Sequence, residues 1–408
     1  MRVYKPSGIE WLGEIPQSWE NVSIRSCFTE SNQRCNTDSY PLLSVTIANG
    51  IIYQDDIENK KDISNDDKSN YKIVPLNAVA YNKMRMWQGA VGVNTLTIGI
   101  VSPAYIVAIP NEKILPNFVS YLFKSKIMIS EFDKNSYGLC LDMNNLRYDD
   151  FRNIKIPLPP LQEQKEIAEF LDKKCEKIQN YINKKQKLIT LLQEKKQALI
   201  NEVVTKGLNP NIESKNSGIA YLGLIPHHWE VRRMKFMASI HNGREQTEIA
   251  DENGIYPIYG SGGILGKSMY FIYDKPSVLL GRKGTIDKPL FVEEPFWTID
   301  TMFYTSISKI VLPKYFYYLC LTIDFQFYIS GSAIPSMTQY DLANISFALP
   351  PLQEQKQIAN FLDEKCEKIN SAIEKTKRQI ELIKEYKNTL INEAVCGRIN
   401  FLEGILNE

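Results

Sequence analysis

The chain has 408 residues, and 48 lysine and arginine side chains nearly balance 47 aspartate and glutamate side chains, which gives a net charge of +1. This length predicts two or three domains, and an apolar content of 44% with a charged content of 23% is ordinary for a soluble globular protein. The near-neutral charge argues against a stand-alone nucleic-acid binder, which usually has a clear basic excess, but not against a reader whose basic side chains are local.

The sequence shows no sign of a membrane span, a signal peptide or a metal site. Lys314 and Asp324 interrupt the best apolar stretch, and charged residues break up the N-terminal segment. The seven cysteines form no CxxC pair. His227 and His228 are adjacent, but no third ligand stands at metal spacing, so a solvated loop is the favoured interpretation. We therefore expect a cytosolic protein.

Two blocks of the sequence occur twice. The shorter block reads SGIEWLGEIPQSWE from Ser7 and SGIAYLGLIPHHWE from Ser217, with nine of 14 positions identical. The longer block reads LPPLQEQKEIAEFLDKKCEKIQ from Leu158 and LPPLQEQKQIANFLDEKCEKIN from Leu349, with 18 of 22 positions identical at an offset of 191. The segments between the copies share little sequence. The chain is therefore expected to duplicate a scaffold that carries two different domains.

The first divergent segment, residues 21–157, has the pattern of short strands, turns and one helix near residues 116–130. The run YPLLSVTIANGIIY from Tyr40 is rich in β-forming residues and predicts a turn at Asn49-Gly50. The run NAVAYNKMRMWQGAVGV from Asn77 leads from an apolar strand into a polar loop. That loop carries four residues that are candidates for contact with a nucleic acid: Asn82, Lys83, Arg85 and Trp87.

Each longer block opens a helix with heptad periodicity. The two prolines at 159 and 160 suit the first helical turn, and Gly207 and Gly397 suit the helix ends. Cys175 and Cys366 fall at a positions and are interpreted as buried small hydrophobic residues. The apolar a and d residues expected to pack in a coiled coil are Leu171, Ile178, Ile182, Ile189, Leu192, Leu199, Leu362, Ile369, Ile373, Ile380, Ile383 and Leu390.

Two such helices in one chain most simply pair with each other in antiparallel orientation, because each follows a compact domain. At ~1.5 Å per residue, the stretch from Ala168 to Val203 would be a rod of ~54 Å, longer than the ~34 Å turn of DNA. A hairpin that only stabilises the fold or dimerises the protein explains the periodicity equally well. The duplication of the flanking shorter block favours a spacer.

The second divergent segment contains a comparable strand and basic loop. In KPSVLLGRKGTID from Lys275, a strand runs into a loop with Arg282, Lys283 and Thr285. Donors of arginine, lysine and asparagine match the edges of guanine and adenine, and glycines let a backbone approach phosphate closely. Residue types alone favour a solvated turn about as strongly as a nucleic-acid contact.

Several motifs suggest enzymatic chemistry but fit it poorly. SGGILGKS, residues 261–268, nearly spells a phosphate-binding P-loop, yet Ser261 stands where the first glycine must be. The stretch from Asp56 to Lys60 contains the E-x-K of metal nucleases within a charge-rich run better interpreted as a solvated loop. The sequence contains no methyltransferase tetrad, helicase P-loop or G-x-S-x-G. We find no catalytic constellation.

The repeated segments IPLPPLQEQKEIAEFLD and ALPPLQEQKQIANFLD resemble the conserved regions of DNA-specificity subunits of type I restriction-modification enzymes. Further similarities are the G-x-IP-x-x-W starts, YNKMRMWQGAVGV with GIVSPAY in the first domain, and YPIYGSGGILG with GRKGT and FWTIDTMFY in the second. Together they cover nearly the whole chain in the order of the family. The expected fold class is α+β, with two α/β target-recognition domains separated by an antiparallel two-helix coiled coil in a pseudo-twofold repeat.

The expected domains follow this order. They are residues 1–157 (N-terminal segment and first recognition domain), 158–207 (central helix), 208–348 (second conserved segment and second recognition domain) and 349–408 (C-terminal helix). The resemblance implies a non-catalytic subunit that reads a bipartite, asymmetric site in double-stranded DNA. Each domain would read one half-site, and the helix pair would set the gap. No membrane or small-molecule substrate is expected.

The resemblance also implies partners. Two modification subunits would bind S-adenosylmethionine and dock on the helix pair, and restriction subunits would use ATP and Mg²⁺ for translocation, so no cofactor is expected in this chain. The DNA-binding candidates are Asn82, Lys83, Arg85, Trp87, Tyr137, Ser261, Arg282, Lys283, Thr285 and Ser330. Two other readings stay open: a coiled-coil scaffold that joins protein partners without reading DNA, and an NTP site at the near P-loop.

Overall fold

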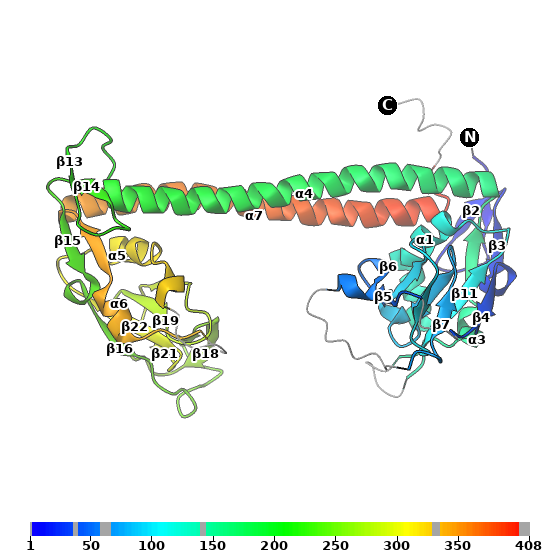
Figure 1. Ribbon diagram of the computed structural model, residues 1–408, viewed down its shortest axis with the longest axis horizontal. Coiled ribbons are helices and arrows are strands. Elements are labelled where there is room, and N and C mark those ends of the chain that lie inside the picture. Colours follow the sequence, from blue (N-terminus) through cyan, green and yellow to red (C-terminus); the bar gives the residue numbers. More distant parts are fainter. Residues whose placement is uncertain (1, 36–39, 58–66, 139–143, 329–334, 400–408) are drawn as a thin grey trace. The chain divides into compact units, whose positions relative to one another are not determined.

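The computed structural model describes residues 2–35, 40–57, 67–138, 144–328 and 335–399. Two compact units divide the chain: residues 1–184 with 378–408 form the first, and residues 185–377 form the second. Each unit contains one mixed α/β domain and parts of two long helices, as Figure 1 shows for the labelled elements. In the part of the chain that is described, no helix is long and apolar enough to cross a membrane.

The first domain is built on a four-stranded antiparallel sheet of order β4-β11-β8-β9. Its strands are β4 (Phe28–Ser31), β8 (Val79–Asn82), β9 (Val91–Val93) and β11 (Tyr105–Pro110). Antiparallel pairs surround it: β1 (Tyr4–Pro6) with β2 (Glu14–Pro16), β3 (Glu20–Ser23) with β12 (Lys155–Leu158), β5 (Leu43–Thr46) with β6 (Gly50–Tyr53), and β7 (Lys72–Val74) with β10 (Gly99–Val101). The turn predicted at Asn49-Gly50 connects β5 to β6, with Gly50 in the left-handed region.

The helical part of the first domain differs from the single helix predicted near residues 116–130. The structure has α1 (Pro116–Lys124) and α2 (Lys126–Lys134), and a short α3 (Tyr148–Phe151) follows. Ser125 separates α1 from α2 because its backbone is extended and its hydroxyl caps α2 by accepting a hydrogen bond from the backbone N–H of Met128. Apolar periodicity continues across this break, which explains why one helix was predicted.

The second domain repeats this plan with different lengths. Its main antiparallel sheet has the order β16-β22-β19-β20. The strands of the domain are β13 (Ser214–Asn216), β14 (Leu224–Pro226), β15 (Glu230–Arg233), β16 (Ala238–Asn242), β17 (Tyr256–Gly260), β18 (Gly263–Ser268), β19 (Ser277–Gly281), β20 (Leu290–Val292), β21 (Trp297–Thr298), β22 (Met302–Ile307) and β23 (Ser346–Leu349). Its helices are α5 (Pro313–Cys320) and α6 (Gln339–Asn344), and β15 pairs with β23 as β3 pairs with β12.

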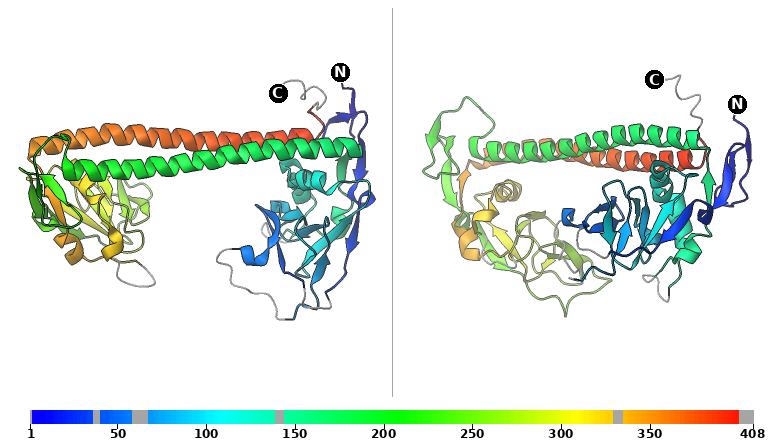
Figure 2. Two further views of the ribbon diagram at one scale, coloured as in Figure 1. Left: turned by 45° about the horizontal axis from the view of Figure 1, so that its top comes forward. Right: turned by 45° about the vertical axis from the view of Figure 1, so that its right-hand side comes forward.

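The two long helices are α4 (Leu161–Lys206) and α7 (Leu352–Val395). In both units they run in opposite directions, because the start of each helix lies beside the end of the other (Figures 1 and 2). In the second unit, Lys196 Nζ donates a hydrogen bond of 2.9 Å to Asn370 Oδ1. All twelve apolar heptad residues are buried or half-buried. The antiparallel pair expected from the periodicity is therefore present.

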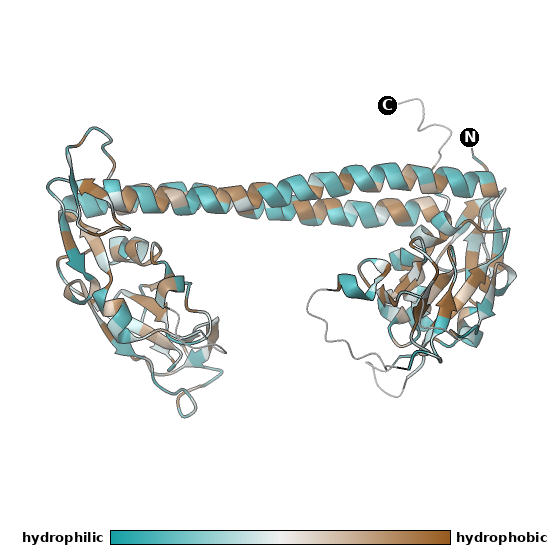
Figure 3. Cartoon of the chain, viewed as in Figure 1, coloured by the Kyte–Doolittle hydropathy of each residue, from teal (hydrophilic) through white to brown (hydrophobic). Residues whose placement is uncertain are grey.

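The helices also close the core of each domain. In the first unit, Ile167 and Leu171 of α4 belong to the same buried cluster as Trp19 and Phe118. In the second unit, Ile358 and Leu362 of α7 share a cluster with Trp229 and other domain residues. The hydropathy colouring in Figure 3 shows apolar residues on the strands within each domain and polar residues over much of the helix surface. Burial of these apolar side chains fixes each domain to its helices.

Candidate nucleic-acid interface

A buried glutamine from each repeated block connects the long helix to its domain. The Gln164 side chain is fully buried: its Oε1 accepts from the backbone N–H of Leu115 at 2.7 Å, and its Nε2 donates to the carbonyl oxygens of Lys113 and Pro159 at 2.9 and 2.8 Å. Leu115 precedes α1, so the glutamine satisfies a backbone donor at the start of that helix. The repeated block therefore fixes the orientation of α1.

Gln355 makes the same contacts in the second unit. Its Oε1 accepts from the backbone N–H of Leu312 at 2.8 Å, and its Nε2 donates to the carbonyl oxygens of Ile310 and Pro350 at 3.0 and 2.9 Å. Leu312 precedes α5 as Leu115 precedes α1. Two domains of different sequence are thus seated on their helices by identical chemistry.

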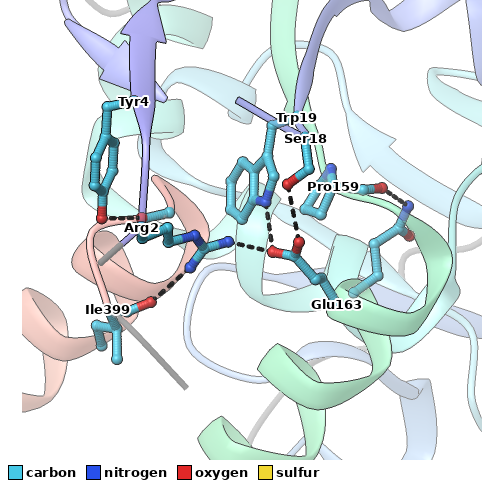
Figure 4. Close-up of polar contacts among 9 residues, drawn as sticks. Arg2, Tyr4, Ser18, Trp19, Pro159, Glu163 and Ile399 are labelled. Carbon is cyan, nitrogen blue, oxygen red and sulfur yellow. Dashed lines mark hydrogen bonds and ion pairs between the residues drawn. The ribbon is translucent and has the colours of Figure 1, made fainter. Parts of the chain in front are cut away.

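Tryptophan–glutamate pairs add a second duplicated contact. Trp19 Nε1 donates to Glu163 Oε2 at 2.7 Å, and Trp229 Nε1 donates to Glu354 Oε2 at 2.9 Å. Figure 4 shows the first pair, where Ser18 and Arg2 also reach the Glu163 carboxylate. In the second copy His228 binds Glu354, with Nε2 and Oε1 2.6 Å apart. The histidine pair predicted to be a solvated loop thus contributes His228 to this structural contact.

In the first domain, the candidate basic loop follows β8. Asn82 ends the strand and accepts the backbone N–H of Met84 on its Oδ1 at 3.0 Å, and a short 3-10 turn, η3 (Met86–Gln88), completes the loop. Arg85 is exposed, while Asn82, Lys83 and Trp87 are half-buried. Trp87 Nε1 donates to the carbonyl of Met84 at 3.1 Å, and this hydrogen bond within the loop stabilises its conformation.

In the second domain, the candidate loop follows β19. The backbone N–H groups of Arg282 and Lys283 both donate to the carbonyl of Thr301, at 2.8 and 3.2 Å. The hydroxyl of Thr301 accepts from the backbone N–H of Ser261 at 3.4 Å. Thr301 therefore brings together Ser261, Arg282 and Lys283, three candidates that are separated in the sequence.

The Arg282 guanidinium lies across an aromatic ring and beside a pocket. Its Cζ is 5.9 Å from the centroid of Phe303, and its Nη1 donates to the carbonyl of Asp300 at 3.2 Å. A pocket of about 400 Å³ adjoins it. The pocket is lined by Asn242, Arg282, Lys283, Phe303, Ser336, Met337, Thr338 and Gln339. Side chains of the types that pair with base edges, Asn242, Arg282 and Gln339, thus line one open depression.

Two glycines shape this loop. A Cβ on Gly281 would lie 2.4 Å from the carbonyl oxygen of Thr285, so only glycine allows the chain to turn back this closely. Gly284 has a φ of +81°, and a Cβ there would lie 3.1 Å from Ser261 Oγ. Thr285, the remaining candidate of the loop, is half-buried.

The same hydrogen bond supports both basic loops. The backbone N–H of Leu146 donates to the carbonyl of Lys83 at 2.8 Å, and that of Met337 donates to the carbonyl of Arg282 at 3.0 Å. Leu146 and Met337 are buried and are separated by the offset of the repeats, 191. The basic loops therefore occupy equivalent places in two domains whose loop sequences differ.

Each domain has one lower-ranked candidate, which precedes its final helix in the sequence. Tyr137 is 68% exposed and forms a β-bridge with Asn145, directly before Leu146. Tyr137 therefore pairs with the segment whose next residue, Leu146, supports the Lys83 loop. Ser330 lies outside the described residues.

The motifs that suggested enzymatic chemistry form other structures. Most of the near P-loop is strand β18, which pairs with β17, whereas a P-loop must lead into a helix. The E-x-K stretch lies mostly outside the described residues, which resume at Asp67. Within the described ranges, no group of three or more His, Cys, Asp or Glu side chains could hold a metal ion.

Sequence reasoning missed several residues at these loops. Asn242 and Gln339 line the Arg282 pocket but come from β16 and α6. Arg147 directly follows Leu146, at the position of Thr338 in the second domain. The offset of 191 continues upstream of the repeated block through these residues, so extending the internal alignment could have found Arg147, Thr338 and Gln339. Nothing in the sequence pattern marks Asn242.

The chain matches the family described as type I restriction modification DNA specificity domain over residues 16–193 and 226–382. It is 27% identical over 336 residues to the type I restriction enzyme MjaVIII specificity subunit of Methanocaldococcus jannaschii, covering 74% of both chains.

The fold is also similar to two solved structures. One is a chain from a structure described as the structural basis of complex assembly and conformational transition of the type I R-M system, with a TM-score of 0.74, 15% identity and coverage of 94% of this chain and 99% of the other. The other is the HsdS subunit from Thermoanaerobacter tengcongensis, with a TM-score of 0.51, 17% identity and coverage of 94% and 98%. These identities support the fold alone. Because the family match covers most of the chain in two copies, the protein belongs to the type I restriction-modification DNA-specificity family and is a specificity subunit with two recognition domains.

Proposed function

We propose that this specificity subunit reads a bipartite, asymmetric site in double-stranded DNA, with one half-site for each recognition domain. The observation that carries the proposal is the pair of basic loops after β8 and β19, supported by the same backbone hydrogen bond but carrying different side chains. Equivalent placement gives both domains the same docking geometry, and different side chains give them different base preferences.

The helix pair would set the gap between the half-sites. Each long helix contributes to both units, and the domains are seated on it by the duplicated glutamine and tryptophan–glutamate contacts. With 46 residues, α4 would span ~69 Å at ~1.5 Å per residue. That is about two turns of DNA, which is enough to place two readers on successive major-groove faces.

The chain itself is not an enzyme, as a specificity subunit acts through partner subunits. We propose that two modification subunits dock on the duplicated helices and supply the S-adenosylmethionine site. Restriction subunits would join through them and supply the ATP and Mg²⁺ sites. The net charge of +1 supports this division of labour, because partner subunits would provide the positive field that the chain lacks.

A binding experiment tests the DNA-reading role. The chain is combined with its modification subunit, and its affinity for a matched duplex is compared with that for a scrambled duplex at fixed salt. Arg282→Ala should reduce the preference at one half-site by about 5- to 100-fold, the value of one good base contact. Arg233→Ala, an exposed arginine of β15 in the same unit, serves as the control and should leave the preference unchanged.

Equal affinity of the wild-type complex for matched and scrambled duplexes would contradict the proposal. It would revive the scaffold that joins protein partners without reading DNA. That alternative is not favoured, because the match to the DNA-specificity family extends over both recognition domains.

A further inference from the structure

In the first domain, the ammonium group of Lys124 is bound by three backbone carbonyl groups. Its Nζ donates to Thr46 O at 3.1 Å, Ile47 O at 2.7 Å and Gly89 O at 2.9 Å. An ammonium has three N–H donors, so these carbonyls can use them all. Burial lowers the pKa of Lys124 to about 8. Burying this charge is therefore costly, and the three carbonyls offset the cost.

The three carbonyls come from two surface turns. Thr46 and Ile47 belong to the turn between β5 and β6, residues 46–50. Gly89 ends the basic loop after β8, directly behind η3, and has a φ of +89°. The hairpin also packs closely on the next strand, because a Cβ on Gly92 would lie 2.7 Å from the backbone nitrogen of Ile51. Lys124 thus connects the hairpin turn to the basic loop through their backbone carbonyl groups.

Each of the two turns carries exposed side chains. In the hairpin turn, Ile47 is 47% exposed and Asn49 is also exposed; in the basic loop, Met84 is 48% exposed and Arg85 is exposed. A lysine that served only the domain core would bind buried elements. Lys124 instead fixes two turns that present exposed side chains at the surface, although Met86 of the basic loop is buried in the domain core.

We propose that Lys124 is a positioning residue for DNA reading by the first domain, and that the turn at residues 46–50 belongs to the DNA interface together with the basic loop. By holding Gly89, the ammonium fixes the end of the loop that carries Arg85 and Trp87. By holding Thr46 and Ile47, it places the hairpin turn beside that loop. The inference rests on the proposed function, in which the loop contacts DNA.

The second domain fixes its basic loop differently. α5 and α1 both begin with proline, at Pro313 and Pro116, and the residue aligned with Lys124 is Leu321. There the loop is held by the Thr301 carbonyl and by the contact of Arg282 with Phe303. Reading of the half-site by the second domain should therefore not depend on Lys124. That half-site serves as an internal control in the same complex.

The test measures base preference separately in each half-site, by selecting bound duplexes from a randomised library with the complete chain and its modification subunit. Lys124→Met should lower the preference in one half-site at least about tenfold and leave the other unchanged. Lys126→Met removes the same charge from an exposed lysine two residues away and should change neither half-site. Lys124→Arg keeps a cation and should regain part of the lost preference.

A Lys124→Met complex that keeps its preference in both half-sites would overturn the proposal. So would an equal loss in both, because that indicates general destabilisation. If this variant does not fold, the double change Ile47→Ala with Asn49→Ala decides, since it alters only exposed side chains. It should weaken binding to the cognate duplex at the same half-site, and unchanged binding would overturn the proposal. A wild-type complex without sequence preference would instead refute the proposed function itself.

Discussion

The carboxamide oxygen of Gln164 accepts a hydrogen bond of 2.7 Å from the backbone N–H of Leu115, and the same bond recurs between Gln355 and Leu312 at 2.8 Å. Both glutamines are fully buried. The repeated helix starts, which are nearly identical in sequence, thus hold the two recognition domains, which share little sequence. This explains how one scaffold can carry two different domains.

This contact predicts the effect of removing the glutamine. Gln164→Leu should leave the Leu115 N–H and two carbonyl oxygens without partners and destabilise the start of α1 by about 2–4 kcal/mol. Hydrogen exchange at the Leu115 amide measures this directly and should become faster. Gln162→Leu, at an exposed position two residues away, should leave that exchange rate unchanged. Slow exchange in Gln164→Leu would show that the bond contributes little.

The lysines within the heptad seam predict a stabilising change. Lys196 and Lys387 occupy matching a positions, and Lys196 Nζ donates to Asn370. Polar residues at a positions specify register at a cost in stability. Replacing both lysines with leucine should raise the thermal midpoint, equivalent to about 1–2 kcal/mol. A lower midpoint would mean that the lysine contacts stabilise the helix pair more than apolar packing does.

The close packing of Gly281 predicts that a larger residue there reduces base preference at one half-site only. Gly281→Ala places a Cβ 2.4 Å from the Thr285 carbonyl, so the Arg282 loop must shift. The preference at the half-site read by the second domain should fall, with the other half-site unaffected. Gly262→Ala, where a Cβ would meet nothing within 4 Å, is the matched control. Wild-type selectivity in Gly281→Ala would remove this loop from the interface.

The thiol of Cys396 predicts a pH dependence of stability. Burial raises its pKa to about 11 from about 9, with Arg398 opposing and Glu393 assisting the shift. Below pH 9 both states keep the proton. Between pH 9 and 11 the unfolded chain loses it first, so folding stability falls as pH rises, by up to about 3 kcal/mol. The melting temperature of the wild-type protein should fall more steeply over this pH window than that of Cys396→Ala. Parallel plots of melting temperature against pH for the two proteins would contradict the raised pKa of Cys396.

The sequence predicted much of the architecture because periodic and duplicated patterns report local structure. The heptad positions of both helices, the turn at Gly50 and the strand before Arg282 follow from spacing and turn chemistry alone. The break at Ser125 was missed, since a single capping serine interrupts a pattern that is otherwise helical.

The site was harder to predict because its parts meet only in three dimensions. The basic loops were found from residue types, but Thr301, Asn242 and Lys124 act through contacts made by distant strands and turns. A lysine at the end of an amphipathic helix looks like an ordinary surface residue until its three carbonyl partners are known. Which of the ten candidate residues contact DNA stays a prediction.

A change in the length of the helix pair tests whether α4 and α7 space the two recognition domains. Lys196 lies near Cys366, and Lys387 lies near Cys175. In this antiparallel register, residues 182–188 of α4 face residues 374–380 of α7. Removing both heptads keeps the seam in register and shortens each helix by ~10 Å. The site selected by the complex with its modification subunit should keep both half-sites, with the gap between them shorter by about three base pairs. An unchanged gap would contradict the claim that the helices space the two readers.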